Sequence, residues 1–394
     1  MESGLENTKK AIIWLTLGHM VCDIYGGFLN PIMPFIAAKL GFSMAIATVI
    51  ISIAHICSSM MQPVFGFFAD NMLKRFFIFW GLILASLFIP LTPLAPNIGF
   101  LLVFMILGAL GGSFFHPQSL GFLNYFSGEH CSDNMGVFMS MGSLGFAFGP
   151  LLAALITQVL GLDMIAYTSI FGLILAFLMF YCVPKLSLTE KKPEHKEFIT
   201  SFKEILGNRQ MDLLLLVGML KSLITNSSCI LLPFLWKNMG ASPFYIGFAL
   251  FLFVFAGALG SFASPKFEKL VGSKPIIYFS MWATFPMMLA FALTYKSHPH
   301  ISLITFFIMG FTTMLAQPVI MVWGQRTLPQ YKSIVAGFIN GFCWGIVALC
   351  VSILGTVAEQ FGIMKVLVVI SILPVFASYF VKYLNEHKLA NTDI

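Results

Sequence analysis

The stretch GHMVCDIYGGFLNPIMP, residues 18–34, lies in the first long apolar segment of the chain and places His19 and Asp23 among hydrophobic residues. A charged side chain at the centre of a membrane-spanning helix costs about 2.5–3.5 kcal/mol on insertion scales, so such a residue normally faces a polar cavity and serves a function there. His19 and Asp23 are four residues apart and therefore share one face of a helix. We expect that face to contact water.

The composition is that of a membrane protein. Hydrophobic residues make up 58% of the 394 residues and charged residues only 10%, whereas soluble domains carry about 25% charged residues. A membrane-spanning helix needs about 20 apolar residues. Turn signals and charges divide the sequence into twelve such segments, at residues 11–37, 44–68, 76–95, 98–120, 134–160, 163–183, 209–236, 243–265, 275–295, 300–323, 333–358 and 363–384. The predicted fold class is an all-α membrane protein with twelve transmembrane helices.

A charged segment divides these helices into two sets of six. We predict an N-terminal six-helix bundle at residues 1–183, a cytoplasmic linker at 184–208, and a C-terminal bundle with a cytoplasmic tail at 209–394. The linker should hold a short interfacial helix from about His195 to Leu206.

The two halves also resemble each other at an offset of about 200 residues. Gly18 pairs with Gly218, His116-Pro117 with Gln317-Pro318, and Gly136 with Gly337. Two pseudo-symmetric bundles are the architecture in which one half rocks against the other around a site near the midplane.

The basic residues predict the orientation. Lys39, Lys237, Lys296 and Lys365 lie on one side of the predicted membrane and Lys221 lies within a span, whereas all other lysines and arginines fall at the N-terminus, in the even-numbered connections or in the tail. The positive-inside rule then places both termini in the cytoplasm. The net charge of +6 is a topology signal, and it gives no support to nucleic-acid binding.

Several motifs resemble those of a known family. GFFADNMLKR, with Gly66, Asp70, Lys74 and Arg75, is similar to the signature loop between the second and third spans of the major facilitator superfamily. GSLGFAFGP, residues 142–150, is similar to the glycine-proline motif in the fifth span of its antiporter branch. Four further stretches resemble the fosmidomycin-resistance family of drug exporters: GHMVCD from 18, QPVFGFFAD from 62, FHPQS from 115 and GPLLAALI from 149.

This resemblance implies the major facilitator fold and export of a drug-like or small metabolite molecule by alternating access in a bacterial inner membrane. It implies a proton gradient as the energy source and no cofactor. It also implies gating residues. Asp70, paired with Lys74 and Arg75, could latch the outward-facing state, unless the loop is simply a solvated basic connection. Gly149 permits close helix contact and Pro150 bends its span.

Asp23 is the predicted proton carrier. It is the only carboxylate deep inside a span, and low-dielectric surroundings favour the neutral form of a carboxyl group. His19 and His116 are its predicted proton partners, because histidine titrates in the physiological range. The alternatives are a structural aspartate permanently paired with His19 or Lys221, and for His116 a hydrogen bond that only packs helices.

The predicted substrate contacts are spread over both halves. Lys221 is the one cation deep in the second half, and we expect it either to bridge to Asp23 or to bind an anionic group of the substrate. Polar and aromatic residues within spans are further candidates, although hydrogen bonds between helices would also explain the polar ones: Tyr25, Gln62, Asn226, Gln317, Asn340 and Trp344.

Enzymatic and metal chemistry find no support in the sequence. No GxxxxGK[ST] loop, HExxH pair or serine nucleophile motif appears. The seven cysteines form no CxxC pair. Glu129, His130, Cys131 and Asp133 crowd one loop, but their spacing fits no standard zinc site. We therefore expect no enzyme activity, no ATP use and no bound metal.

The leading functional hypothesis is a proton-coupled antiporter. The alternatives are a proton-coupled uptake symporter for an anionic or sugar-like nutrient and a non-transporting membrane receptor. The expected partners are a small-molecule substrate, protons and the lipid bilayer, and we expect the monomer to be the functional unit.

Overall fold

The computed structural model describes residues 2–71, 75–184 and 195–385. Its regular structure is helical, without a strand among these residues. Twelve of its helical segments are long and apolar enough to cross a membrane. The prediction of an all-α membrane protein with twelve spans is therefore confirmed.

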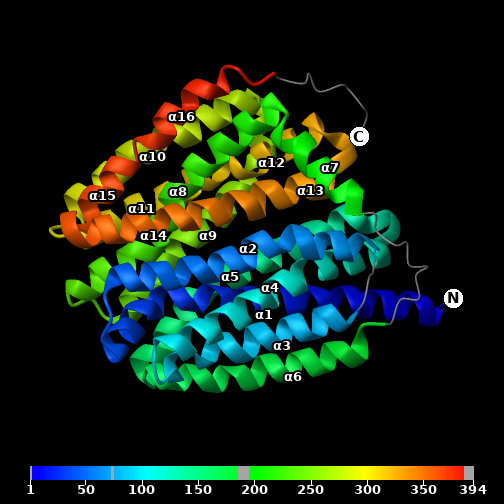
Figure 1. Cartoon of the computed structure of the whole chain (residues 1–394), viewed down its shortest axis with the longest axis horizontal. Helices are drawn as coiled ribbons and strands as arrows, with labels where there is room; N and C mark the ends of the chain where they lie inside the picture. Colours follow the sequence, from blue (N-terminus) through cyan, green and yellow to red (C-terminus); the bar gives the residue numbers. More distant parts are fainter. Residues whose placement is uncertain (1, 72–74, 185–194, 386–394) are drawn as a thin grey trace.

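The first six spans are built from continuous helices and pack together as one group (Figure 1). They are α1 (Glu2–Leu40), α2 (Met44–Asn71), α3 (Arg75–Leu91), α4 (Ile98–Ser127), α5 (Cys131–Val159) and α6 (Ser169–Cys182), the last preceded by a 3₁₀ segment at Leu162–Thr168. Within this group α1 packs on α4 and α5, and α4 packs on α2 and α3.

The last six spans form a second group. They consist of α8 (Arg209–Asn238), α9 (Pro243–Val271), α10 (Ser273–Thr294), α11 (Pro299–Leu315) with α12 (Gln317–Thr327), α13 (Lys332–Gly337) with α14 (Cys343–Phe361), and α15 (Ile363–Ile370) with α16 (Leu373–Val381). The linker helix α7 (His195–Leu206) matches the predicted helix, and the other linker residues, 185–194, lie outside the described part.

Three of these later spans are interrupted, which the sequence analysis did not predict. Pro318 and Pro374 stand near the starts of α12 and α16, and proline cannot donate the backbone hydrogen bond that would continue the preceding helix. Between α13 and α14 the chain forms a π-helix at Phe338–Phe342. Such π segments are rare and are often found at functional sites.

Side-chain caps explain where several helices begin. The Asn97 side chain accepts from the Phe100 amide at 3.1 Å, and Ser242 accepts from Tyr245 at 3.2 Å. Asn208 accepts from the amides of Gln210 and Met211 at the start of α8. Each cap satisfies backbone donors that the first helical turn leaves unpaired.

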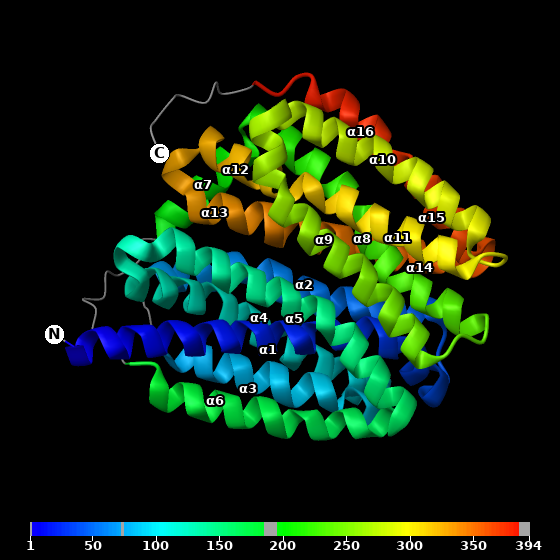
Figure 2. The same cartoon turned by 180° about the vertical axis from the view of Figure 1, so that it is seen from behind.

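Both described termini lie at the same end of the molecule, which we call the termini end; the opposite end is the far end (Figure 1). The two groups of six spans meet chiefly through α5 on α9 and α2 on α14. Towards the termini end, α5 and α9 diverge (Figure 2).

Small residues allow close contact between the groups near the far end. A Cβ atom on Gly247 of α9 would collide with the Pro150 carbonyl and the Ala154 methyl of α5. A Cβ atom on Gly355 of α14 would likewise collide with Thr48 of α2. Neither glycine can be replaced by a larger residue unless the two groups of helices move apart.

Polar contacts reinforce the far end. Glu359 of α14 accepts a hydrogen bond from the Ala45 amide, in the first turn of α2, at 2.9 Å. The Lys237 ammonium of α8 lies 5.7 Å from the centre of the Phe35 ring of α1. Both contacts join one group to the other, beside a cavity of about 460 Å³ that Lys237 and Glu359 help to line.

Candidate functional site

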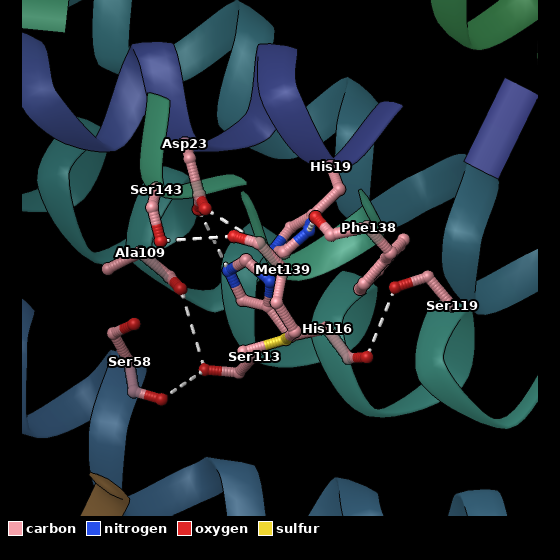
Figure 3. Close-up of polar contacts among 10 residues, drawn as sticks. All are labelled: His19, Asp23, Ser58, Ala109, Ser113, His116, Ser119, Phe138, Met139 and Ser143. Carbon is pink, nitrogen blue, oxygen red and sulfur yellow. Dashed lines mark hydrogen bonds and ion pairs between the residues drawn. The ribbon is translucent and has the colours of Figure 1, made fainter. Parts of the chain in front are cut away.

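Three titratable side chains from α1 and α4 converge inside the first group of helices (Figure 3). His19 Nε2 lies 3.2 Å from Asp23 Oδ2, and His116 Nε2 lies 3.4 Å from Asp23 Oδ1. The rings of the two histidines are 5.1 Å apart, edge to face. The structure thus brings together the three residues predicted to carry the proton, and Asp23 is the member that touches both others.

Helix α5 holds His19 in one orientation. His19 Nδ1 donates to the Phe138 carbonyl at 2.9 Å, and the His19 ring stacks on the Phe138 ring at 4.0 Å. With Nδ1 occupied, Nε2 is directed at Asp23 (Figure 3). Sequence reasoning missed Phe138, because a backbone carbonyl that accepts a hydrogen bond leaves no signature in the residue type.

A glycine on α5 leaves room for the cluster. A Cβ atom on Gly142 would lie 2.7 Å from Asp23 Oδ2 and would collide with the His19 ring. Further along, a Cβ atom on Gly27 of α1 would lie 2.8 Å from Pro150 and 3.1 Å from Gly149. The predicted close approach through Gly149 is therefore present, whereas gating by Gly149 and Pro150 remains a prediction.

The cluster of His19, Asp23 and His116 is only partly buried. The side chains of Asp23 and His116 keep 21% and 28% of their surfaces exposed, whereas His19 is buried. A partly exposed carboxylate between two imidazoles can accept a proton, share it and release it.

Hydroxyl groups hold the part of α4 that carries His116. The Ser113 hydroxyl donates to the Ser58 carbonyl of α2 at 2.7 Å, and Ser119 donates to the His116 carbonyl at 3.1 Å (Figure 3). Pro117 breaks the backbone ladder between them, because it has no N–H to donate. These bonds fix the backbone while the imidazole stays partly exposed.

Lys221 lies apart from this cluster. Its ammonium is fully buried and donates to the Thr313 carbonyl of α11 at 3.1 Å, an acceptor it shares with the Ser280 hydroxyl of α10. The described ion pairs of Asp23 go to the two histidines and not to Lys221. The predicted bridge between Lys221 and Asp23 is thus absent here, and the buried ammonium is out of reach of a substrate in this conformation.

Tyr25 is also committed to packing. Its buried hydroxyl donates to the Thr168 carbonyl at 2.6 Å and accepts from the Gly172 amide at 3.1 Å, which ties α1 to α6. Asn226 is buried and donates to the Ser222 carbonyl one turn back at 3.3 Å. The geometry of these two residues gives their predicted substrate contacts no support.

The other predicted substrate residues belong to several helices. Gln62 of α2, Gln317 at the start of α12 and Trp344 of α14 are half-buried. Asn340 belongs to the π-helix, but its side chain lies outside the described part. Substrate contact by these residues remains a prediction.

The signature loop is described only in part. Gly66 and Asp70 belong to α2 with their surroundings undescribed, and Lys74 lies outside the described residues. Arg75 begins α3, and its guanidinium donates to the carbonyls of Phe180 and Val183 at 2.8 and 3.1 Å. Arg75 therefore binds the free carbonyls at the end of α6, a contact that sequence reasoning did not foresee.

Two bacterial proteins resemble this chain over most of its length. The Fosmidomycin resistance protein of Escherichia coli (strain K12) is 25% identical over 364 residues, covering 91% of this chain and 89% of that protein. The uncharacterized MFS-type transporter YfnC of Bacillus subtilis (strain 168) is 23% identical over 376 residues, covering 92% and 90%.

Solved structures agree on the fold. The nucleoside transporter NupG superposes with a TM-score of 0.75 at 14% identity, covering 96% of this chain and 100% of that one. A bacterial homolog to the human lysosomal transporter Spinster, inward-facing and unoccupied, gives 0.73 at 14% identity, covering 96% and 97%. The sequence profile of the Major Facilitator Superfamily matches residues 15–352 of this chain. With its twelve spans in two groups of six, this chain belongs to the Major Facilitator Superfamily of transporters.

Proposed function

We propose that this protein is a proton-coupled exporter that exchanges a drug-like or small metabolite molecule for protons by alternating access. The observation that carries the proposal is Asp23, a partly exposed carboxylate inside a span and within 3.4 Å of two imidazoles. An ionisable group within a membrane span is costly to retain unless it serves a function.

The cluster suggests how proton and cargo are coupled. Deprotonated Asp23 can accept from the Nε2–H of His19 on its own helix and of His116 on α4. Because His19 Nδ1 also donates to the Phe138 carbonyl, His19 is an imidazolium in this state. Protonation of Asp23 removes the negative charge that both imidazoles face, which weakens the contact between α1 and α4. In the proposed cycle this change in helix packing is linked to cargo affinity, so that cargo binding and proton binding exclude each other.

The contacts between the two groups favour one state of the cycle. With both termini in the cytoplasm, as the basic residues indicate, the far end faces the periplasm of a bacterial inner membrane. Close packing at Gly247 and Gly355 and the Glu359 hydrogen bond lie at that end. This arrangement fits an inward-facing state, in which cargo would enter from the cytoplasm.

Two observations favour export over uptake. The Escherichia coli relative is named for resistance to fosmidomycin, and removal of a drug from the cell is a direct route to resistance. Uptake of an anionic nutrient calls for an accessible cation, and Lys221, the candidate for binding an anionic substrate group, is fully buried against a backbone carbonyl.

Inverted membrane vesicles test the proposal directly. Respiration acidifies their interior, and an antiporter would carry added cargo inward while protons leave. We expect fosmidomycin, or a compound that raises the melting temperature of the purified protein, to dissipate the pH gradient in vesicles containing the protein and not in empty-vector vesicles. A compound that binds but leaves the gradient intact would contradict exchange, and proton-driven accumulation in right-side-out vesicles would establish uptake instead.

A further inference from the structure

His19, Asp23 and His116 have the composition of a transition-metal site as well as that of a proton site. Their ligand atoms all lie within 4.8 Å of one another, and they are the group among the described residues that could hold a metal ion. Two imidazoles and one carboxylate favour zinc, cobalt or nickel ions over magnesium and calcium, which prefer oxygen ligands throughout.

The spacing of the ligand atoms is close to what such an ion requires. Ligand atoms at 2.0–2.2 Å from a tetrahedral zinc ion lie about 3.3–3.6 Å apart. The two nitrogen-to-oxygen distances to Asp23 are 3.2 and 3.4 Å. These distances go to different oxygens of the carboxylate, Oδ2 for His19 and Oδ1 for His116. An ion bound through one of these oxygens therefore requires the His116 side chain, which is 28% exposed, to turn towards it.

The surroundings of His19 resemble those of a metal ligand. A histidine that binds a metal through one nitrogen almost always donates its other ring N–H to a carbonyl or a carboxylate, which fixes the ring and increases its basicity. His19 Nδ1 donates to the Phe138 carbonyl at 2.9 Å, and the ring is fixed by stacking on Phe138. His19 Nε2 is thereby held towards the other two ligands.

Access and coordination number also fit. Partial exposure of Asp23 and His116 gives an ion a route to the cluster. Three protein ligands leave at least one coordination position for water, as in zinc sites that exchange their fourth ligand.

We propose that His19, Asp23 and His116 bind one divalent transition-metal ion of the zinc class. The ion competes with protons, because the imidazoles and the carboxylate must be deprotonated to coordinate it. A second consequence rests on the proposed function: a bound ion keeps Asp23 without its proton and so inhibits exchange.

Cobalt absorption tests the site. The purified full-length protein, with its affinity tag removed, is titrated with Co²⁺ in detergent micelles. We expect d–d bands that saturate at one equivalent per chain and disappear when Zn²⁺ is added. His116→Ala and Asp23→Asn should each weaken Co²⁺ binding by about tenfold or more, whereas His55→Ala, which removes a histidine of α2 outside the cluster, should leave it unchanged.

The cobalt titration and a transport assay with Zn²⁺ together distinguish failure of the metal site from failure of the proposed transport function. No saturable bands in the wild type, or equal bands in wild type and in variants that retain their melting temperature, would overturn the metal site. A site that binds Zn²⁺ without slowing transport would leave the metal site standing and contradict the role of Asp23 as proton carrier. If transport requires Asp23 but Zn²⁺ does not slow it and no Co²⁺ bands appear, the metal site is contradicted and the role of Asp23 as proton carrier stands.

Discussion

Helices α1 and α8 open the two groups of spans, and each carries a charged residue deep within a span, yet the two charges are housed differently. Asp23 of α1 keeps 21% of its side chain exposed and faces two imidazoles. Lys221 of α8 is fully buried and donates to the Thr313 carbonyl of α11. The first environment allows proton exchange, whereas the second holds an ammonium against neighbouring helices of its own group.

Depth within a span therefore does not by itself distinguish the proposed proton carrier from a charged residue that only packs helices. Both residues carry the same signature in the sequence, a lone charge in an apolar segment. In the structure, Asp23 and Lys221 differ in exposure and in the groups that they contact: two imidazoles for Asp23 and a backbone carbonyl for Lys221. Four substitutions test this difference between α1 and α8.

Asp23→Asn should have the largest effect. We expect proton-driven exchange in proteoliposomes to fall by about 100-fold or more, because the amide cannot carry the proton. Cargo binding measured by calorimetry should weaken and lose its pH dependence, because asparagine mimics the protonated carboxyl group that excludes cargo. The matched control is Asp212→Asn, which neutralises an exposed carboxylate of α8 and should leave exchange unchanged. Equal losses in both variants would place the proton elsewhere.

Gly142→Ala should disturb the α1 cluster through packing alone. The added methyl group would lie 2.7 Å from Asp23 Oδ2 and overlap His19, and overpacking of this kind costs about 1–3 kcal/mol. We expect a lower melting temperature and at least a tenfold loss of exchange. Gly136→Ala is the control on the same helix, because nothing lies within 4 Å of its Cβ position. If both variants behave alike, the close contact at Gly142 is unimportant.

Lys221→Met tests the other half of the comparison. An ammonium that is buried against a neutral carbonyl is costly to keep charged, so an apolar side chain of similar length should not destabilise the protein. We therefore expect exchange within about threefold of the wild type and a melting temperature that is unchanged or higher. A loss as severe as that of Asp23→Asn would show that α8 also carries a working charge, exposed in another state of the cycle.

Glu359→Gln should have the smallest effect. A carboxylate at a helix N-terminus contributes about 0.3–1 kcal/mol, so its loss should shift the balance away from far-end closure by about two- to fivefold. Spin-label distances between α2 and α14 at the far end report this shift. Glu268→Gln is the control, since Glu268 accepts from Ser273 within the second group, at 2.6 Å, and should not change the distances.

Much of the fold follows from the sequence, for identifiable reasons. Apolar segments bounded by charges and turn residues predicted the twelve spans, and the linker helix matches α7 (His195–Leu206). The interruptions were missed because an apolar segment looks the same whether or not it breaks. The π-helix at Phe338–Phe342 depends on packing that no local pattern reveals.

The candidate site was predictable only where side chains carry the signal. The spacing of four residues placed His19 beside Asp23, and the polarity of His116 within an apolar span suggested a partner on another helix. The partners of Lys221 and Tyr25 are backbone groups of distant helices, and such contacts are invisible in a list of residue types. Position alone therefore assigned these two residues to the substrate.

The protonation state of Asp23 can be followed through the proposed cycle. Infrared difference spectra of the purified protein, recorded with and without a bound cargo, resolve the C=O stretch of a protonated carboxyl group, and Asp23→Asn assigns it. We predict a protonated carboxyl band that is lost when cargo binds and is missing from the Asp23→Asn spectra. A cargo-bound difference spectrum that is the same in wild type and in Asp23→Asn would contradict the claim that Asp23 carries the exchanged proton.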